Sequence, residues 1–227
     1  MSLKPGAALL FDIDGTLADT DEFHREAYNE VMKPWGEVFD HERFVREIQG
    51  FTNADITARL MPNEPIERRL ELSELKEATF RRMVRGHVRP KPGLMVLLDR
   101  ADAAGVPMAA VTNAPRPNAE LMLDALGITD RFKRIVIGDE LAHGKPHPLP
   151  YLEGLRATNG RAECSLAFED SRSGIRSAVD AGLATIGMVA GGNHAQLIES
   201  GAVAAIEDFN DAKVAEWLRQ RLGLWGM

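Results

Sequence analysis

Short unbroken runs of apolar residues alternate with amphipathic segments along most of the chain. The runs cover residues 7–11, 107–111, 134–137, 165–168 and 185–189. Runs of this length are typical of strands that are buried on both faces of a parallel sheet. Apolar residues recur at helical spacing in segments 93–104, 118–126 and 173–181. The alternation predicts an α/β fold with a doubly wound, Rossmann-like parallel sheet.

One long segment, residues 21–88, departs from this pattern. It contains no run of the buried-strand type, and its apolar residues recur at helical spacing. The Pro-containing segment 89–93 follows it and is expected to be stiff. We therefore expect an α/β core formed by residues 1–20 and 89–227, with an α-helical cap domain of residues 21–88 inserted after the first strand.

Charged residues are dense between positions 64 and 85, and we interpret this stretch as a solvated helix face. Over the whole chain, 27 Lys and Arg face 34 Asp and Glu, so the net charge is −7. A negative field repels phosphate backbones and anionic lipid, which disfavours nucleic-acid and membrane-surface partners.

The remaining composition indicates a folded protein of the cytoplasm. Hydrophobic residues make up 44% of the 227 positions, enough for a substantial core. No apolar run approaches the roughly 18 residues of a membrane span, and the first residues lack the features of a signal peptide. The single cysteine, Cys164, has no partner for an internal disulfide, so nothing indicates an oxidising compartment.

The first predicted strand is followed by Asp12-Ile13-Asp14-Gly15-Thr16. In open α/β sheets, ligands bind beyond the carboxyl ends of the strands. Two carboxylates two residues apart at such an edge fit a nucleophile beside an acid–base group, or two ligands of a divalent metal. They also fit a helix N-cap and a turn aspartate, and spacing alone does not decide between these interpretations.

Polar residues also follow three later strands. Thr112 and Asn113 have a hydroxyl and an amide that suit phosphate oxygens or the cap of a helix. Lys145 stands between Gly and Pro, either as a fixed positive charge or as an ordinary surface lysine. Glu169 and Asp170, followed by Ser171 as a residue that starts a helix, suit an oxygen-ligated Mg²⁺ site; the alternative is a helix-capping Asp and Ser pair. Because each motif follows a strand, we expect all of them at one edge of the sheet.

In this order, the motifs DIDGT, VTNA, GKP and FEDSRSG resemble the four motifs of the haloacid dehalogenase superfamily of phosphatases and related enzymes. The resemblance extends over the whole chain, including the helical insert. It implies that Asp12 is the nucleophile, which forms an aspartyl-phosphate. It further implies that Asp14 is the general acid and then the general base, and that Lys145 steadies Asp12.

The same resemblance implies the groups that bind phosphate and metal. The phosphate would be bound by Gly15, Thr112, Asn113 and Lys145. Mg²⁺ would be bound by the side chains of Asp12, Glu169 and Asp170 and by the backbone carbonyl of Asp14. The expected partner is a small phosphomonoester substrate, and the residues indicate no oligomeric state.

The EDS fourth motif together with a helical cap resembles the β-phosphoglucomutase-like group, which holds sugar-phosphate phosphatases and mutases. The mutase pattern has an Arg in a Gly-x-Ser-Arg segment of the cap, where this chain reads Gly50-Phe51-Thr52-Asn53. Loss of a bidentate donor should weaken binding of a bisphosphate. We expect sugar-phosphate hydrolysis, with Asn53 as a candidate substrate contact. A phosphohexomutase and a phosphoglycolate phosphatase are the alternatives.

Overall fold

The computed structural model describes residues 3–49, 51–190 and 193–223. Gly50 of the predicted cap segment and the outermost residues of the predicted core lie outside the described residues. The chain divides into two compact units, Met1–Asp19 with Arg89–Met227 and Thr20–Val88, which we call the core and the cap. Thr20 belongs to the cap in this division, whereas the prediction placed it in the core.

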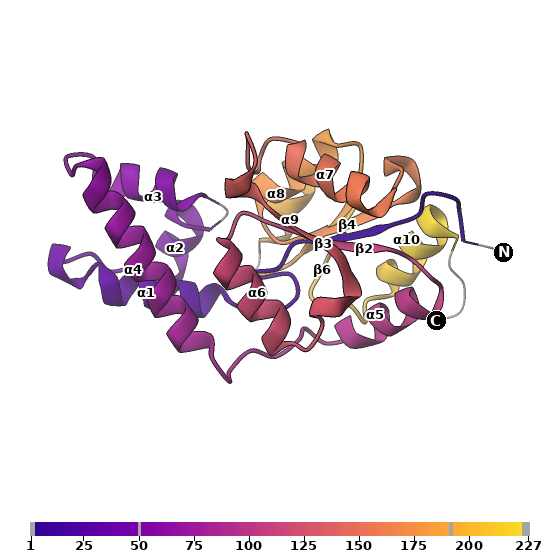
Figure 1. Cartoon of the computed structure of the whole chain (residues 1–227), viewed down its shortest axis with the longest axis horizontal. Coiled ribbons are helices and arrows are strands. Elements are labelled where there is room, and N and C mark those ends of the chain that lie inside the picture. The colour runs from indigo at the N-terminus through magenta and orange to yellow at the C-terminus, as the bar shows by residue number, and fades with distance from the viewer. Residues whose placement is uncertain (1–2, 50, 191–192, 224–227) are drawn as a thin grey trace. The chain divides into compact units, whose positions relative to one another are not determined.

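Within the described residues, six parallel strands form one sheet in the order β3-β2-β1-β4-β5-β6 (Figure 1). The strands are β1 (Leu9–Phe11), β2 (Met108–Thr112), β3 (Phe132–Ile137), β4 (Leu166–Glu169), β5 (Ala184–Met188) and β6 (Ala204–Ile206). Phe11 of β1 is in register with Ala110 of β2 and Phe168 of β4. Every residue of β1, β2 and β4 is buried, as expected for strands covered on both faces. The predicted α/β fold is confirmed.

Helices cover both faces of the sheet, with α7 and α8 on one side and α5 and α10 on the other (Figure 1). The core helices are α5 (Leu94–Ala103), α6 (Arg116–Ala125), α7 (Leu149–Thr158), α8 (Arg172–Asp180), α9 (His194–Glu199) and α10 (Ala212–Leu222). On the α7 side, Leu10 and Tyr151 belong to one apolar cluster. On the other side, the rings of Phe11 and Phe168 stack with centroids 5.1 Å apart. Burial of this apolar surface is the main force that holds the layers together.

Among the strands and α-helices of the described part of the core, three were not predicted. β6 has only three residues and therefore offers no recognisable apolar run. α9 is similarly short, with six residues. α7 begins in a Pro-rich segment, with Pro148 before the helix and Pro150 in its first turn. Proline is tolerated there because the first N–H groups of a helix have no partner within the helix.

The cap is helical, as predicted for this part of the chain. Its helices are α1 (Asp21–Val31), α2 (His41–Glu47), α3 (Asn53–Leu60) and α4 (Ile66–Val84). They enclose an apolar cluster of their own that includes Tyr28, Phe39, Phe44, Ile56 and Leu72. No helix among the described residues has the length and the apolar composition required to cross a membrane.

The interpretation of residues 64–85 as a solvated face is wrong at two positions of α4. The residues Lys76 and Glu77 are only 3% and 6% exposed. Nζ of Lys76 lies 2.9 Å from Oε1 of Glu77, so the two charges neutralise each other inside the cap. Burial of a charged residue is tolerated when such a partner is present.

Candidate active site

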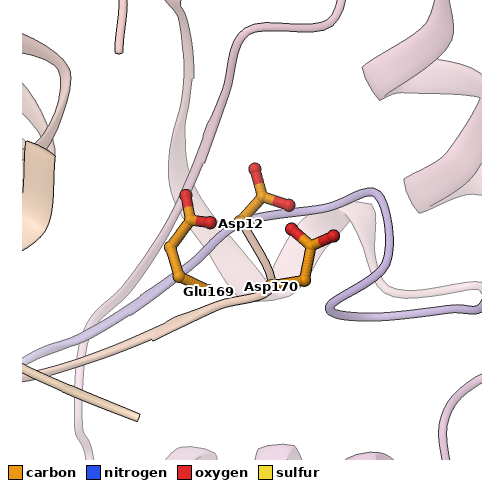
Figure 2. Close-up of side chains that lie close together, drawn as sticks. All are labelled: Asp12, Glu169 and Asp170. Atoms are coloured by element: carbon orange, nitrogen blue, oxygen red, sulfur yellow. The ribbon is translucent and has the colours of Figure 1, made fainter. Parts of the chain in front are cut away.

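Three buried carboxylates converge at the carboxyl edge of the sheet. Asp12 directly follows β1, and its backbone N–H donates to the carbonyl of Phe168 at 3.0 Å. Glu169 is the last residue of the neighbouring strand β4, and Asp170 follows it. Each of these acids offers an oxygen, and the three oxygens all lie within 4.8 Å of one another (Figure 2). Parallel pairing of β1 and β4 therefore places the first and fourth motifs at one point.

The chemistry of this cluster fits a divalent cation. Carboxylate oxygens are the hard ligands that Mg²⁺ and Ca²⁺ prefer. Asp12, Glu169 and Asp170 are all buried, so their negative charges are poorly screened by water and a cation between them would be stabilised. The side chain of Asp14 is not in the group of metal-ligating side chains found among the described residues. Its predicted contact is through the backbone carbonyl and stays a prediction.

The ammonium of Lys145 is buried beside two of these acids. It donates to Oδ1 of Asp12 at 2.6 Å and to the carbonyl of Val111 in β2 at 2.7 Å. It also donates to Oε1 of Glu169. Burial alone lowers the pKa of Lys145, but the carboxylates of Asp12 and Glu169 raise it above its ordinary value overall. Lys145 is thus a fixed positive charge, and the alternative of an ordinary surface lysine is excluded.

Burial dominates the titration of Asp12. It raises the pKa of this carboxyl well above the ordinary value, and the nearby charges of Glu169 and Asp14 act in the same direction. Lys145 opposes the shift through its charge and its hydrogen bond. One ammonium thus faces several acids. A further positive charge at the cluster would favour the ionised carboxylate that a nucleophile needs.

Four donors hold the carboxylate of Glu169. Oε1 accepts from Lys145 and from the hydroxyl of Tyr151 at 3.0 Å. Oε2 accepts from the backbone N–H and the hydroxyl of Ser171, both at 3.2 Å. Gly174 of α8 packs so closely on this carboxylate that a Cβ atom there would overlap it. The orientation of Glu169 is therefore set by α7, by α8 and by the third motif together.

The predicted set lacked two of the residues that donate to Glu169, namely Ser171 and Tyr151. Ser171 was interpreted only as a residue that starts a helix, and it does accept from the N–H of Gly174 at 3.1 Å as the N-cap of α8. Tyr151 lies in α7, which the sequence pattern did not reveal. Burial and the charge of Glu169 raise the pKa of Tyr151 well above its ordinary value, so the phenol remains a donor.

Gly15 forms the turn that brings the first motif close to the fourth. Its φ is +71°, in the left-handed region that favours glycine. A Cβ atom at this position would overlap the carboxylate of Asp170. The structure therefore explains Gly15 by the backbone turn and by the close approach of Asp170. Its predicted contact with phosphate stays a prediction.

The second motif forms a tight turn after β2. The hydroxyl of Thr112 accepts from the backbone N–H of Ala114 at 2.9 Å. Neither Thr112 nor Asn113 caps α6, because Pro115 stands at the N-cap position and the helix begins at Arg116. The capping alternative is therefore wrong for these two residues. The side chain of Asn113 instead contacts the backbone of Lys145.

Asn53 lies in the cap, at the first position of α3. Its Nδ2 donates to Oε1 of Glu77 at 2.7 Å, and its Oδ1 accepts from the hydroxyl of Tyr28 at 3.1 Å. Nζ of Lys76 contacts the same Glu77 and lies 2.9 Å from Nδ1 of His24. Burial raises the pKa of Glu77, but the charges of Lys76 and His24 and the bond from Asn53 outweigh it and lower the pKa to about 2. The amide of Asn53 thus belongs to a buried network, and its contact with substrate stays a prediction.

The chain forms a parallel sheet with buried acids and a lysine at its carboxyl edge, and a helical segment is inserted after the first strand. This combination defines a class of hydrolases with an α/β core and a helical insert. The chain belongs to the haloacid dehalogenase-like hydrolase family, whose model matches residues 9–188.

Individual relatives agree with this assignment. Protein CbbY of Rhodobacter capsulatus is 35% identical over 198 residues, which cover 82% of this chain and 85% of that protein. The phosphorylated carbohydrates phosphatase of Thermotoga maritima is 32% identical over 207 residues, which cover 88% and 94%. A crystal structure of a CbbY variant from Rhodobacter sphaeroides, in complex with xylulose-(1,5)bisphosphate, matches with a TM-score of 0.81 at 28% identity and covers 91% of this chain and 95% of that chain.

Proposed function

We propose that this protein is a magnesium-dependent phosphatase that hydrolyses small phosphomonoesters, chiefly sugar phosphates. The observation that carries the proposal is the ammonium of Lys145 bridging the buried carboxylates of Asp12 and Glu169, with Asp170 alongside. A carboxylate in such a place suits attack on phosphorus. The surrounding positive charge would offset the repulsion between this anion and a phosphate.

The donor set defines where the metal would bind. The carboxylates of Asp12, Glu169 and Asp170 and the backbone carbonyl of Asp14 would hold Mg²⁺. When bound, the ion would supply positive charge next to the phosphate oxygens. Lys145 would supply a second positive charge beside Asp12, while Thr112, Asn113 and Gly15 are the predicted phosphate contacts of the loops.

In the first step, one oxygen of Asp12 would attack phosphorus as the bond from phosphorus to the ester oxygen breaks. The departing ester oxygen would take the proton of the Asp14 carboxyl and leave as an alcohol. The phosphoryl group would remain on Asp12 as an aspartyl-phosphate. Lys145, held at 2.6 Å, would keep the attacking carboxylate ionised and oriented.

In the second step, the carboxylate of Asp14 would accept a proton from water as the water oxygen attacks the same phosphorus. The bond between phosphorus and Asp12 would break, which releases inorganic phosphate and restores both carboxyl groups. One water is consumed for each ester cleaved. Asp14 would therefore act as an acid and then as a base, as microscopic reversibility requires.

Two relatives support sugar phosphates as the substrate class. The Thermotoga maritima relative is named a phosphatase of phosphorylated carbohydrates. The Rhodobacter sphaeroides structure holds a pentulose bisphosphate.

The single cysteine of this chain suits a reducing compartment, so the proposed location of the enzyme is the cytoplasm.

The cap supports hydrolysis over phosphoryl transfer to a second hydroxyl. The residue at position 53 is Asn, and both ends of its amide are bonded to Glu77 and Tyr28 within the cap. It therefore does not supply the bidentate cation that a bisphosphate intermediate favours.

The test is release of inorganic phosphate from a panel of phosphomonoesters, with Mg²⁺ and again with a chelator. We expect Mg²⁺-dependent release, fastest with sugar phosphates. Absence of release from every ester would contradict the proposal. Interconversion of a hexose 1-phosphate and 6-phosphate, primed by a bisphosphate and with little free phosphate, would show a mutase instead.

A further inference from the structure

The side-chain amide of Asn113 makes two hydrogen bonds with the backbone of Lys145, and we call this pair of bonds the clamp. Its Oδ1 accepts from the backbone N–H of Lys145 at 3.0 Å, and its Nδ2 donates to the backbone carbonyl of Lys145 at 3.1 Å. The two residues are 32 positions apart, on the loops that follow β2 and β3. These two bonds tie the second motif to the third and involve both polar ends of the amide.

Two glycines make room for this clamp. A Cβ atom at Gly144 would lie 2.9 Å from Oδ1 of Asn113, and the three atoms nearest to it all belong to Asn113. A Cβ atom at Gly138 would overlap the same oxygen. Neither glycine has a positive φ, so the backbone alone would admit another residue. The amide of Asn113 is therefore the reason that a side chain does not fit at Gly144.

We propose that Asn113 is a positioning residue for Lys145, rather than a residue whose side chain binds phosphate. The clamp fixes the backbone from which the flexible lysine side chain reaches Asp12, Glu169 and the carbonyl of Val111. This inference rests on the proposed phosphatase function, because Lys145 acts there on the nucleophile. It assigns to the amide a role different from the one the family resemblance implies.

The two roles predict different kinetics. A displacement of about 1 Å at a catalytic group can cost about 100-fold in rate. If Asn113 positions Lys145, Asn113→Ala should lower kcat by about 10- to 100-fold and change KM by less than about threefold. If its side chain binds phosphate, the same substitution should raise KM and weaken inhibition by inorganic phosphate to a similar extent.

A double-mutant cycle tests the clamp itself. We would compare wild type, Asn113→Ala, Gly144→Ala and the double variant for kcat, KM, inhibition by inorganic phosphate and the midpoint of thermal unfolding. In the wild-type background, Gly144→Ala should displace the amide and lower kcat to about the level of Asn113→Ala. In the Asn113→Ala background it should cost less than about threefold more, because the obstructing atoms are gone.

Each outcome of the cycle has a defined meaning. Losses in kcat that multiply in the double variant, or a loss confined to KM and phosphate inhibition, would overturn the positioning role. If wild type hydrolyses no ester, the proposed function fails, and the clamp is judged on the unfolding midpoints alone. A non-additive effect on those midpoints would support the clamp, and additive effects would overturn it.

Discussion

Nζ of Lys145 lies 2.6 Å from Oδ1 of Asp12, although 133 positions separate the two residues in the chain. The contact exists because β3, β2 and β1 are successive neighbours in the sheet, so that the loop after β3 and the end of β1 meet at one edge. Its consequence is electrostatic. Asp12, Glu169 and Asp170 bring three acids to a buried point, and the ammonium of Lys145 contacts two of them. This negative charge underlies the expected metal dependence.

Lys145→Met should abolish most activity, because it removes the ammonium and keeps much of the aliphatic stem. Without that charge, the pKa of Asp12 would rise further and the nucleophile would lose its orientation. We expect kcat to fall by about 100-fold or more, the scale of other electrostatic contacts in active sites. Lys133→Met is the matched control, since Lys133 is exposed on β3. Equal kcat values for wild type and Lys145→Met would refute the assigned role.

Divalent cations should stabilise the folded protein even when no substrate is present. At Mg²⁺ about 100-fold above Kd, binding adds about 2.7 kcal/mol, which raises Tm by about 5 to 10 °C for a chain of this size. Asp170→Asn removes one charge of the cluster and should reduce this shift by more than half. NaCl at equal ionic strength serves as the control. A shift that is the same with NaCl, or unchanged in Asp170→Asn, would show that the cluster is not the metal site.

Tyr151→Phe should weaken metal binding, because Glu169 loses one of the four donors that orient it. Substitutions of such supporting groups typically cost 10- to 100-fold in metal affinity, and we expect about 10-fold. Tyr28→Phe is a matched control. Its hydroxyl is also bonded, to Asn53 in the cap, so it should lower stability by about 1 kcal/mol and leave the Mg²⁺ affinity unchanged. Titration calorimetry measures the Mg²⁺ affinity of wild type and of both variants. Equal Mg²⁺ affinities for wild type and Tyr151→Phe would contradict the prediction.

The free energy of unfolding of the cap should depend on pH, because the pKa of Glu77 is lowered in the folded state. The pKa of this group falls from 4.5 to about 2 on folding, so the folded state binds fewer protons than the unfolded state between these values. Its contribution is present above pH 4.5 and is lost as the pH falls toward about 2, by up to about 3 kcal/mol. Glu77→Gln should be less stable than wild type at pH 7, and the difference should shrink by pH 3. Urea unfolding at both pH values measures it; a constant difference would contradict the assignment.

Much of the core could be predicted from the sequence, because strands buried in a parallel sheet appear in it as short local runs of apolar residues. Once the sheet was predicted, the residues after each strand had to face a common edge. Asp12, Lys145, Glu169 and Asp170 became candidates in this way, and the resemblance of their motifs to the haloacid dehalogenase superfamily favoured catalytic roles over the alternatives that spacing left open. The structure places all four together.

The remaining features depend on packing between distant segments, which periodicity does not report. Tyr151 reaches Glu169 from a helix that begins among prolines, and Val111 contributes only a backbone carbonyl to Lys145. In the sequence, Lys76 and Glu77 look like any exposed pair of charged residues. Their burial follows from their contacts within the cap. The hydrogen bonds of Asn113 join two loops that are distant in the sequence. The sequence alone therefore could not distinguish an amide that binds Lys145 from an amide that binds phosphate.

The most direct test of the account compares wild type with Asp12→Asn for release of phosphate from sugar phosphates in the presence of Mg²⁺. The substitution preserves the shape of the side chain and removes the nucleophilic carboxylate. Asp124→Asn, an exposed position on α6, controls for the change of charge. We predict that wild type and Asp124→Asn turn over and that Asp12→Asn releases no phosphate above background. Turnover by Asp12→Asn at a rate near that of wild type would contradict the aspartyl-phosphate mechanism.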